Sequence, residues 1–299
     1  MLPITRLPKQ YYVFWVIESA SYPYMDINEL NGVFNWTMKF RKNSDIFLPY
    51  GRIVQIKDHP PPGPDLDALI KDFGLKNQHL AHDRKNDSRA AWFVSNCKTK
   101  SNRESLVKEI MQSIPVDVYG KCSKLYNINF EEKACDRGCD GNQYDCSKER
   151  CYKMLETNYR YYLSFENSIC QDYVTEKFFR PLKYDVIPIT LNGADMNNLA
   201  PPHSFINIFD YNSTMDLILH LKKLSNNNAL YASYFWWKDY YEVRNDPIKD
   251  RAQSYCDLCA KLNNPEEPSK IYENMYKWWI SDSKCYRYGS NAKLHTTSP

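Results

Sequence analysis

The chain has 299 residues, of which 43% are hydrophobic, and a formal net charge of +3. This length supports one large core or two smaller ones, and two domains are the better expectation at this size. So small a net charge gives no electrostatic reason to expect a nucleic-acid-binding protein, because such proteins usually concentrate basic residues on one face.

The first predicted element is a buried strand at Tyr11–Ile17, an apolar run that ends before Glu18. The run is much shorter than the ~20 apolar residues of a membrane span. Residues 1–9 contain two prolines and lack the apolar core of a signal peptide. A proline-rich run at 57–64 is predicted to interrupt regular structure.

From residue 89 onward, predicted strands alternate with predicted helices. The strands are Ala91–Ser95, Val116–Tyr119, Tyr161–Phe165, Val186–Leu191 and Ser204–Phe209. Helices are predicted at Ser101–Ser113, from about Val174 and after Thr214. This alternation is typical of a parallel α/β sheet with both faces covered. The middle of the chain is therefore predicted to be Rossmann-like, although it has no G-x-G-x-x-G motif.

Cysteines and glycosylation sequons favour a lumenal or secreted protein. The ten cysteines are Cys97, Cys122, Cys135, Cys139, Cys146, Cys151, Cys170, Cys256, Cys259 and Cys285. So many cysteines suggest an oxidising compartment, in which disulfides persist. The candidate glycosylation sites are Asn35, Asn86 and Asn212. Zinc is the alternative, because Cys256 and Cys259 have ligand spacing, but no second C-x-x-C accompanies them.

The segment Ser101-Asn102-Arg103-Glu104 has the capping-box pattern and predicts the start of a helix. Arg103 would then lie in the first turn, where a cation opposes the helix dipole. An anion such as phosphate at the helix N-terminus would explain this placement. A solvated surface arginine is the alternative interpretation.

Polar residues also follow the predicted strand Tyr161–Phe165. Glu166 and Asn167 come at the carboxyl end of that strand, where α/β sheets bind ligands. Glu176 and Lys177 open the next helix, and neighbouring helix positions point in different directions. The carboxylate could therefore bind sugar hydroxyls while the ammonium binds a diphosphate. An ordinary charged first turn is the alternative.

The stretches Tyr161–Ser168, Asp172–Phe179 and Val186–Ile189 together resemble the donor-binding motif of the α1,3-fucosyltransferases, glycosyltransferase family 10. Further matches, in the family's order, are Phe34–Met38, Ser44–Gly51, Ala91–Asn96, Asp117–Gly120, Leu230–Phe235 and the Cys256/Cys259 pair. The resemblance covers most of residues 11–262. The cysteine-rich insertion and Tyr184-Asp185-Val186 are more similar to the invertebrate and plant core-type enzymes than to the vertebrate Lewis-type enzymes.

The resemblance implies an α/β fold of GT-B architecture, with two Rossmann-like lobes facing a cleft. Residues 1–88 would form a partial acceptor-side lobe, 89–250 the GDP-fucose-binding lobe and 251–299 a cysteine-containing tail. The family has further strands before the Glu18 segment, and this chain has no room for them, so we expect a truncated N-terminal lobe. Trp278-Trp279-Ile280 suggests a packed segment in the tail.

The same resemblance implies an enzyme, an inverting α1,3-fucosyltransferase that moves fucose from GDP-fucose to a GlcNAc hydroxyl of an N-glycan, with the glycan core favoured. Glu18 would be the catalytic base. The donor-binding residues would be Arg103, Tyr119, Tyr162, Asn167, Glu176 and Lys177. Since Arg103 and Lys177 supply positive charge on the leaving side and no D-x-D motif occurs, we expect no required cofactor, with Mn²⁺ or Mg²⁺ at most stimulatory. A strand-end carboxylate that caps a backbone N–H is the alternative for Glu18.

Two departures from the family pattern accompany these expectations. Ala20 replaces the family's usual proline, and Pro181 should end or kink the helix that follows Lys177. The alternative functions are a truncated, inactive paralogue that only binds GDP-fucose or glycan, and a Lewis-type enzyme acting on glycan antennae. We expect a type II Golgi membrane protein with its catalytic part in the lumen, an anchor absent from this chain, and no nucleic-acid partner.

Overall fold

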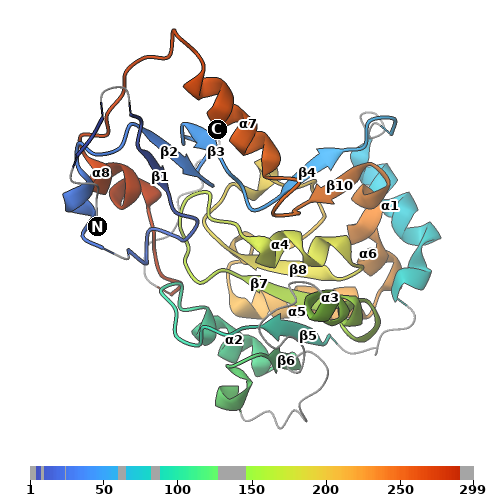
Figure 1. Cartoon of the computed structure of the whole chain (residues 1–299). Helices are drawn as coiled ribbons and strands as arrows, with labels where there is room; N and C mark the ends of the chain where they lie inside the picture. Colours follow the sequence, from blue (N-terminus) through green and yellow to red (C-terminus); the bar gives the residue numbers. More distant parts are fainter. Residues whose placement is uncertain are drawn as a thin grey trace.

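The computed structural model describes residues 5–7, 10–23, 25–59, 65–81, 88–126 and 146–289. The chain forms two parallel sheets with helices around them, and a two-stranded antiparallel sheet beside the larger one (Figure 1). Within the described residues, no helix has the length and apolar character that crossing a lipid bilayer requires.

The small sheet is built from the N-terminal part of the chain. Its strands, in spatial order, are β1 (Val13–Trp15), β2 (Trp36–Lys39) and β3 (Ile46–Phe47). Both pairings are parallel, with Trp15 opposite Met38 and Met38 opposite Ile46. Strand β1 is shorter than the predicted strand Tyr11–Ile17.

The large sheet has five parallel strands in the order β6-β5-β7-β8-β9. They are β5 (Ala90–Phe93), β6 (Val116–Tyr119), β7 (Tyr161–Phe165), β8 (Ile187–Leu191) and β9 (Ile206–Asn207). Strands β7 and β8 are buried at every residue, because side chains cover both of their faces. The predicted bounds of β6 and β7 are confirmed. Strand β9 is shorter than predicted, because a 3-10 turn begins at Ile208.

Helices surround the sheets (Figure 1). They are α1 (Leu66–Lys76), α2 (Arg103–Met111), α3 (Cys146–Asn158), α4 (Glu176–Phe179), α5 (Thr214–Ser225), α6 (Asn228–Ala232), α7 (Ala252–Leu262) and α8 (Met275–Trp279). Short 3-10 helices occupy Ile27–Leu30, Gln78–Ala81, Ser123–Tyr126, Pro181–Lys183, Met196–Asn198, Ile208–Asp210, Ser233–Asp239 and Ser281–Ser283. As predicted, Pro181 ends the helix after Lys177: α4 stops at Phe179 and a 3-10 turn follows.

The core of the large sheet is apolar and continuous. Ile187 and Ile189 of β8 and Leu163 of β7 pack in one cluster with Ile110 of α2 and Leu221 of α5. Each fully buried side chain of this kind contributes about 1.5–3 kcal/mol relative to its exposed state. The cluster fixes the strands, and so fixes where their carboxyl ends lie.

The remaining strands join parts of the chain that are distant in sequence. Strand β4 (Arg52–Gln55) pairs antiparallel with β10 (Tyr241–Arg244). Side chains of α1, such as Phe73, pack against the cluster of the large sheet. Both β4 and α1 precede residue 88, so they lie with the large sheet although they come early in the chain. The proposed division at residues 88 and 250 stays a prediction.

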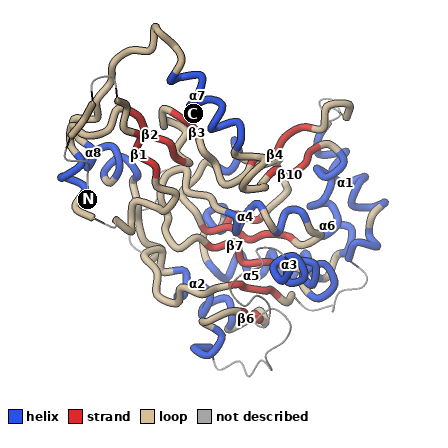
Figure 2. Tube along the Cα trace, in the orientation of Figure 1, coloured by secondary structure: helices blue, strands red, loops and turns tan. Residues whose placement is uncertain are grey.

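Residues 270–288, which we call the C-terminal strap, run from the small sheet to the large one. Tyr272 exchanges two backbone hydrogen bonds of 2.9 Å with Phe34 and Gly32 beside the small sheet. At the other end, the backbone N–H of Tyr286 donates to Ile169 and that of Tyr288 donates to Ser101, each at 2.9 Å. Figure 2 shows the α8 helix beside β1, at the small-sheet end of the strap, where Trp279 packs against Phe14.

Candidate active site

Lys177 lies in a cluster of charges where β7 ends and α4 begins. Its Nζ is 3.3 Å from Glu166 Oε2 and 3.3 Å from Glu176 Oε1, and it donates to Thr175 Oγ1 at 2.9 Å. Glu166 is fully buried and accepts from the backbone N–H and the hydroxyl of Thr175, each at 2.8 Å. About a quarter of the Lys177 side chain is exposed, so its ammonium is held rigidly and remains accessible.

The three charged groups alter one another's protonation. Burial alone would lower the pKa of Lys177, but attraction to Glu166 and Glu176 outweighs it and raises that pKa. Burial raises the pKa of Glu166. For Glu176, burial is outweighed by Lys177, a backbone N–H and Arg180, so its pKa is lowered. The cluster therefore presents a permanent cation beside an ionised carboxylate at neutral pH.

Arg103 is the first residue of α2, as predicted, but the capping box is wrong. The helix is preceded by Asn102, which has a left-handed backbone and makes no side-chain cap bond. The Ser101 hydroxyl instead donates to the Glu166 carbonyl at 2.7 Å, and Glu104 accepts from Thr99. The Ser101 side chain therefore bonds the residue that follows β7 and does not cap α2.

The Arg103 guanidinium is buried at the carboxyl edge of the large sheet. It is 2% exposed, and it donates to the carbonyls of Phe165 at 2.6 Å and Asn96 at 3.0 Å. Burial lowers its pKa, while Glu104 and Glu166 oppose that effect. Arg103 thus ties the ends of β5 and β7 together and places its charge close to the Lys177 cluster.

Asn167 follows Glu166 and carries a polar atom without a protein partner. Its Oδ1 is buried and accepts no hydrogen bond from the described residues, while its carbonyl accepts from the backbone of Ser101 at 3.0 Å. A buried acceptor without a partner calls for an explanation, and a bound ligand is one. Asn167 is therefore well placed for the predicted donor contact.

Tyr119 and Tyr162, both predicted to line the nucleotide pocket, lie in a closed aromatic cluster. They are 8% and 1% exposed and pack with Phe93, and with Tyr152 of α3. The Tyr119 hydroxyl is 2.5 Å from that of Tyr159. Burial raises the pKa of Tyr162 well above its usual value, and the charges of Glu176 and Arg103 also act on this hydroxyl. The structure brings Tyr162 close to the charged cluster but leaves both tyrosines without an open surface.

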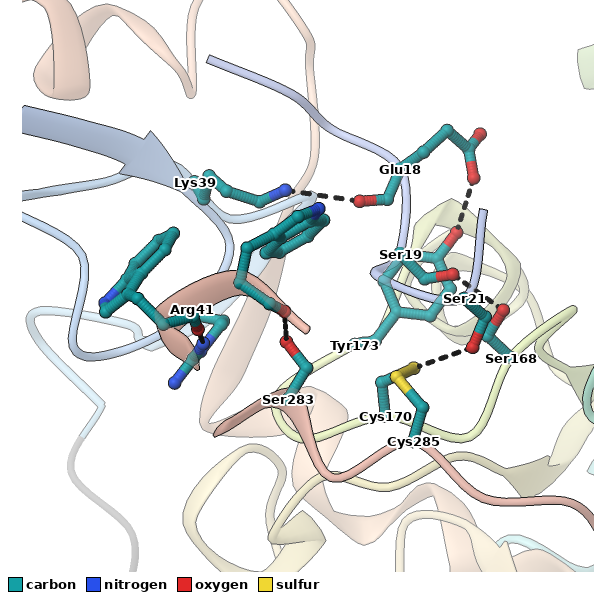
Figure 3. The surroundings of a disulfide bond; sticks show 12 residues. Glu18, Ser19, Ser21, Lys39, Arg41, Ser168, Cys170, Tyr173, Ser283 and Cys285 are labelled. Atoms are coloured by element: carbon teal, nitrogen blue, oxygen red, sulfur yellow. Dashed lines mark hydrogen bonds between the residues drawn. A yellow bond between two sulfur atoms is a disulfide. The ribbon is translucent and has the colours of Figure 1, made fainter. Parts of the chain in front are cut away.

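Glu18 lies just after β1, at the carboxyl edge of the small sheet. Its backbone carbonyl accepts from Lys39 Nζ at 3.3 Å, and its carboxylate accepts from the Tyr173 hydroxyl at 3.2 Å (Figure 3). The next residue, Ser19, bonds through its hydroxyl to Ser168 at 2.6 Å. Tyr173 and Ser168 both belong to the segment between β7 and α4, so Glu18 faces the segment that leads to Lys177.

Tyr173 connects the Glu18 segment with the segment between β7 and α4. Burial raises the pKa of its hydroxyl, and the charges of Glu166, Glu18 and Glu176 add to that effect. The link between the segment after β1 and the segment between β7 and α4 is the hydrogen bond from this hydroxyl to Glu18. The sequence reasoning missed Tyr173 and the ion pair of Glu166 with Lys177, although both residues stand inside the motif that it singled out.

A cavity of about 550 Å³ lies beside this arrangement. It is lined by Tyr22, Cys97, Lys98, Thr99, Lys100, Asn102, Glu104 and Arg287. Tyr22 comes from the segment after Glu18, and its hydroxyl accepts from the backbone of Lys100 at 3.1 Å. The cavity therefore opens between the Glu18 segment and the start of α2, and its size suits a small ligand.

The glycosylation candidates differ in accessibility. Asn35 is 6% exposed, and its side-chain amide donates to the Lys270 carbonyl at 2.9 Å and accepts from Tyr12 N at 2.9 Å. The fold leaves no room for a glycan there, so the Asn35 prediction is corrected. Asn212 is exposed and stays a candidate. Asn86 lies outside the described residues.

The cysteines form two disulfides within the described residues, Cys97–Cys122 and Cys170–Cys285. Cys256 and Cys259 are exposed on α7 and unpaired. Within the described part of the chain, no third cysteine, histidine or carboxylate gathers with them into a metal-binding group. The side chains of Cys135, Cys139 and Cys146, which belong to the cysteine-rich insertion, lie outside the described residues.

Two family models match the chain. The one described as "Glycosyltransferase family 10 (fucosyltransferase) C-term" matches residues 83–278, and the one described as "Fucosyltransferase, N-terminal" matches residues 1–51. The two matches include both carboxyl edges at which Glu18 and Lys177 lie.

The curated relatives that the chain resembles are described as alpha-(1,3)-fucosyltransferases. The chain is 33% identical over 288 residues to alpha-(1,3)-fucosyltransferase C of Drosophila melanogaster, with 95% of this chain and 62% of that protein covered. It is 30% identical over 279 residues to alpha-(1,3)-fucosyltransferase fut-1 of Caenorhabditis elegans, with 91% and 58% covered. It is 30% identical over 283 residues to alpha-(1,3)-fucosyltransferase 7 of Bos taurus, with 93% and 69% covered. The chain thus spans about six tenths of the length of the first two relatives.

A solved structure described as "Crystal Structure of alpha1,3-Fucosyltransferase" is similar with a TM-score of 0.50 and 16% identity. The match covers 89% of this chain and 76% of that one. At this identity the likeness concerns the fold alone. With the two parallel sheets described above, it confirms the predicted α/β fold of GT-B architecture.

Proposed function

The chain belongs to glycosyltransferase family 10, the fucosyltransferases, and on that basis we propose that it is an inverting α1,3-fucosyltransferase. The donor is GDP-fucose, and the acceptor is a GlcNAc hydroxyl of a glycoprotein N-glycan. The observation that carries the proposal is the hydrogen bond of 3.2 Å from the Tyr173 hydroxyl to the Glu18 carboxylate, beside the bond between Ser19 and Ser168. It joins an acceptor-side carboxylate to the segment that leads to Lys177.

The reaction is a single displacement. Glu18 accepts the proton of the acceptor hydroxyl while the oxygen attacks the anomeric carbon of fucose. The bond from that carbon to the GDP oxygen breaks, and its electron pair leaves with GDP. Positioned general-base catalysis of this kind contributes about 10²- to 10⁴-fold.

The leaving side requires positive charge because GDP becomes more negative as the bond breaks. Lys177 is suited to this role, since its raised pKa keeps it protonated and part of its side chain is exposed. Arg103 adds a buried positive charge and orders the strand ends. Glu176 binds fucose hydroxyls, and Asn167 Oδ1 accepts from the donor. With this charge supplied by side chains, Mn²⁺ or Mg²⁺ would be stimulatory rather than required.

Glu166 positions Lys177 through their ion pair of 3.3 Å. It is fully buried, so removing Lys177 would leave an unpaired carboxyl group in the interior. A Lys177→Ala protein must therefore be tested for folding before its activity is interpreted. Lys177→Gln, which keeps a hydrogen-bond donor for Glu166, is the safer second variant.

We favour the core GlcNAc as acceptor, because the Tyr184-Asp185-Val186 sequence and the cysteine-rich insertion resemble those of the core-type enzymes. Antennary transfer is the alternative outcome of the test. The two disulfides support an oxidising compartment, which we propose to be the Golgi lumen. We also propose that the full-length protein is held there by a membrane anchor.

The test is a transfer assay with GDP-fucose and a GlcNAc-terminated N-glycopeptide, with and without EDTA. Mass spectrometry detects one added deoxyhexose, and fragmentation places it on the core or the antenna. Glu18→Gln should lower kcat by at least about 10²-fold with GDP-fucose binding retained, and Lys177→Gln should weaken that binding. The matched controls are Glu29→Gln and Lys183→Gln, at two exposed positions.

The outcomes separate the alternatives. Persistent transfer by Glu18→Gln removes Glu18 as the base. Binding of GDP-fucose without transfer to any acceptor identifies a donor-binding protein. A folded protein that neither binds nor transfers contradicts the proposed function.

A further inference from the structure

Lys39 is a buried lysine that the reaction described above does not use. It is the last residue of β2, the central strand of the small sheet, and it is 0% exposed. Its Nζ lies over the rings of Trp279, Phe40 and Phe14, at 2.9, 5.1 and 5.5 Å from their centroids. It forms no ion pair with any residue that the structure describes. Lysine is almost never buried in this way without a carboxylate partner.

The surroundings of this amine favour its uncharged form. Burial and, to a smaller extent, the nearby Arg41 lower the pKa of Lys39 to about 5, although Glu18 acts in the opposite direction. These are the two charged groups that face it. At neutral pH the side chain is therefore a neutral amine with two N–H donors.

One of those donors reaches the Glu18 backbone. Lys39 Nζ to Glu18 O is 3.3 Å, and Figure 3 shows the side chain extended toward that carbonyl. The neighbouring Ile17 carbonyl accepts from the Tyr50 hydroxyl, and Ser19 bonds to Ser168. Three consecutive residues are thus held by side chains from three different segments.

The bland explanation is that Lys39 only fills space in the core. A methionine has nearly the same length and shape, and it needs no deprotonation to be buried. The amine is therefore the less stable choice for a core position. A methionine at this position could still pack against the three rings, but it could not make the hydrogen bond to the Glu18 carbonyl.

We infer that Lys39 is a positioning residue, whose side-chain nitrogen holds the Glu18 backbone so that the carboxylate points toward Tyr173. This inference rests on the proposed function, in which Glu18 is the base. A base displaced by about 1 Å loses up to about 10²-fold in rate, so a modest shift of this backbone is sufficient to matter.

The test compares Lys39→Met with the unmodified protein in the transfer assay and in thermal unfolding. We expect kcat to fall about 10- to 100-fold while KM for GDP-fucose stays within about twofold. We expect Tm to rise by about 2–6 °C, because a group that must lose a proton on folding has been removed. A gain of stability together with a loss of kcat is a result that a merely structural role does not produce.

The pH dependence provides a readout that needs no activity. Between the folded pKa of about 5 and the unfolded value near 10.5, the unfolded chain binds one proton more than the folded chain at this side chain. Stability therefore rises with pH in this window, and Lys39→Met removes that contribution. The Tm gain of Lys39→Met should be larger at pH 6 than at pH 9.

Lys39→Arg keeps hydrogen-bond donors but brings a permanent charge into the aromatic surroundings, so both kcat and Tm should fall. Lys42→Met, at an exposed position three residues on, should change neither. Unchanged kcat in Lys39→Met, or a parallel loss of Tm and kcat, overturns the inference. If the unmodified protein transfers no fucose, the proposed function fails, and the Tm difference between pH 6 and pH 9 still decides whether the buried amine is neutral.

Discussion

The two parallel sheets of this protein are stabilised in different ways. The five-stranded sheet packs mainly against helices from its own part of the chain, as Ile189 of β8 does with Ile110 of α2 and Leu221 of α5. The three-stranded sheet has few such neighbours. Its core joins Phe14 of β1 to Met275 and Trp279, which come more than 200 residues later.

The difference follows from sheet size and cover. A three-stranded sheet with strands of two to four residues cannot enclose a core without outside elements. The C-terminal strap supplies that cover, and it brings polar groups that pair with buried charges. Arg41 donates to the Trp278 carbonyl, and Asp45 binds Lys270 and Tyr272. The three-stranded sheet therefore depends on a distant part of the chain, whereas the five-stranded sheet packs mainly within its own part.

The largest effect on this contrast is expected from Trp279→Ala. Trp279 is 2% exposed and packs on Phe14 and Phe40, with ring centroids 5.9 and 6.2 Å away. We expect a loss of about 3–5 kcal/mol in the free energy of unfolding. Hydrogen exchange should show the lost protection in β1–β3, with β5–β9 still protected.

Tyr276→Ala, on the exposed side of the same helix, is the matched control and should change stability by no more than about 0.5 kcal/mol. Equal loss of protection in both sheets after Trp279→Ala would show that the two halves unfold as one unit and would break the comparison.

A second, smaller effect is expected from Cys285→Ser combined with Cys170→Ser. The disulfide joins residues 115 positions apart and attaches the strap to the donor-side segment. Its removal should lower the free energy of unfolding by about 2–4 kcal/mol. Denaturant unfolding under non-reducing conditions measures this loss.

Cys259→Ser provides the control, because this cysteine is exposed and unpaired on α7. If the double variant is as stable as the unmodified protein, the hydrogen bonds of the strap suffice to join the two sheets without the covalent link.

The smallest effect is expected from Asp45→Asn. Asp45 accepts from the Thr37 backbone at 2.8 Å, from Lys270 at 2.6 Å and from Tyr272 at 2.7 Å. Burial would raise the pKa of Asp45, but these hydrogen bonds outweigh it and lower that pKa. The carboxylate thus contributes stability above its unfolded pKa of about 3.9, and this contribution is lost as the pH falls through the lower folded value.

We expect Asp45→Asn to cost about 1–2 kcal/mol at pH 7 and progressively less below pH 4, as judged by urea unfolding at several pH values. Asp58→Asn, at an exposed residue, should have no such pH dependence. A penalty that is independent of pH would assign the loss to altered packing rather than to the charge.

The five-stranded sheet could largely be predicted from the sequence, because the patterns that indicate its strands are local. Strands β6 and β7 match their predicted bounds, since each is a short run of β-forming residues. Glu166 and Lys177 also stand inside one recognisable motif. Their ion pair follows once the strand end and the helix start are known.

The packing of the strap on the three-stranded sheet could not be predicted, because its contacts join residues that no local sequence pattern relates. Trp278-Trp279-Ile280 suggested a packed segment, but nothing in it indicated Phe14 as the partner of Trp279. From the sequence alone, Lys39 is indistinguishable from an exposed strand lysine, because the residue that covers it, Trp279, is 240 positions away. The capping box at Ser101 failed for the same reason, since the Glu166 carbonyl competes for that hydroxyl.

The strap also has a consequence for biosynthesis. Residues of β1 and β2 leave the ribosome early, but the side chains that cover them, Met275 and Trp279, are translated long afterwards. The apolar face of the three-stranded sheet therefore stays without this cover until the strap has been translated. During that interval Phe14 lacks the side chains that bury it in the folded protein, and Cys170 cannot pair with Cys285 until the strap has been translated.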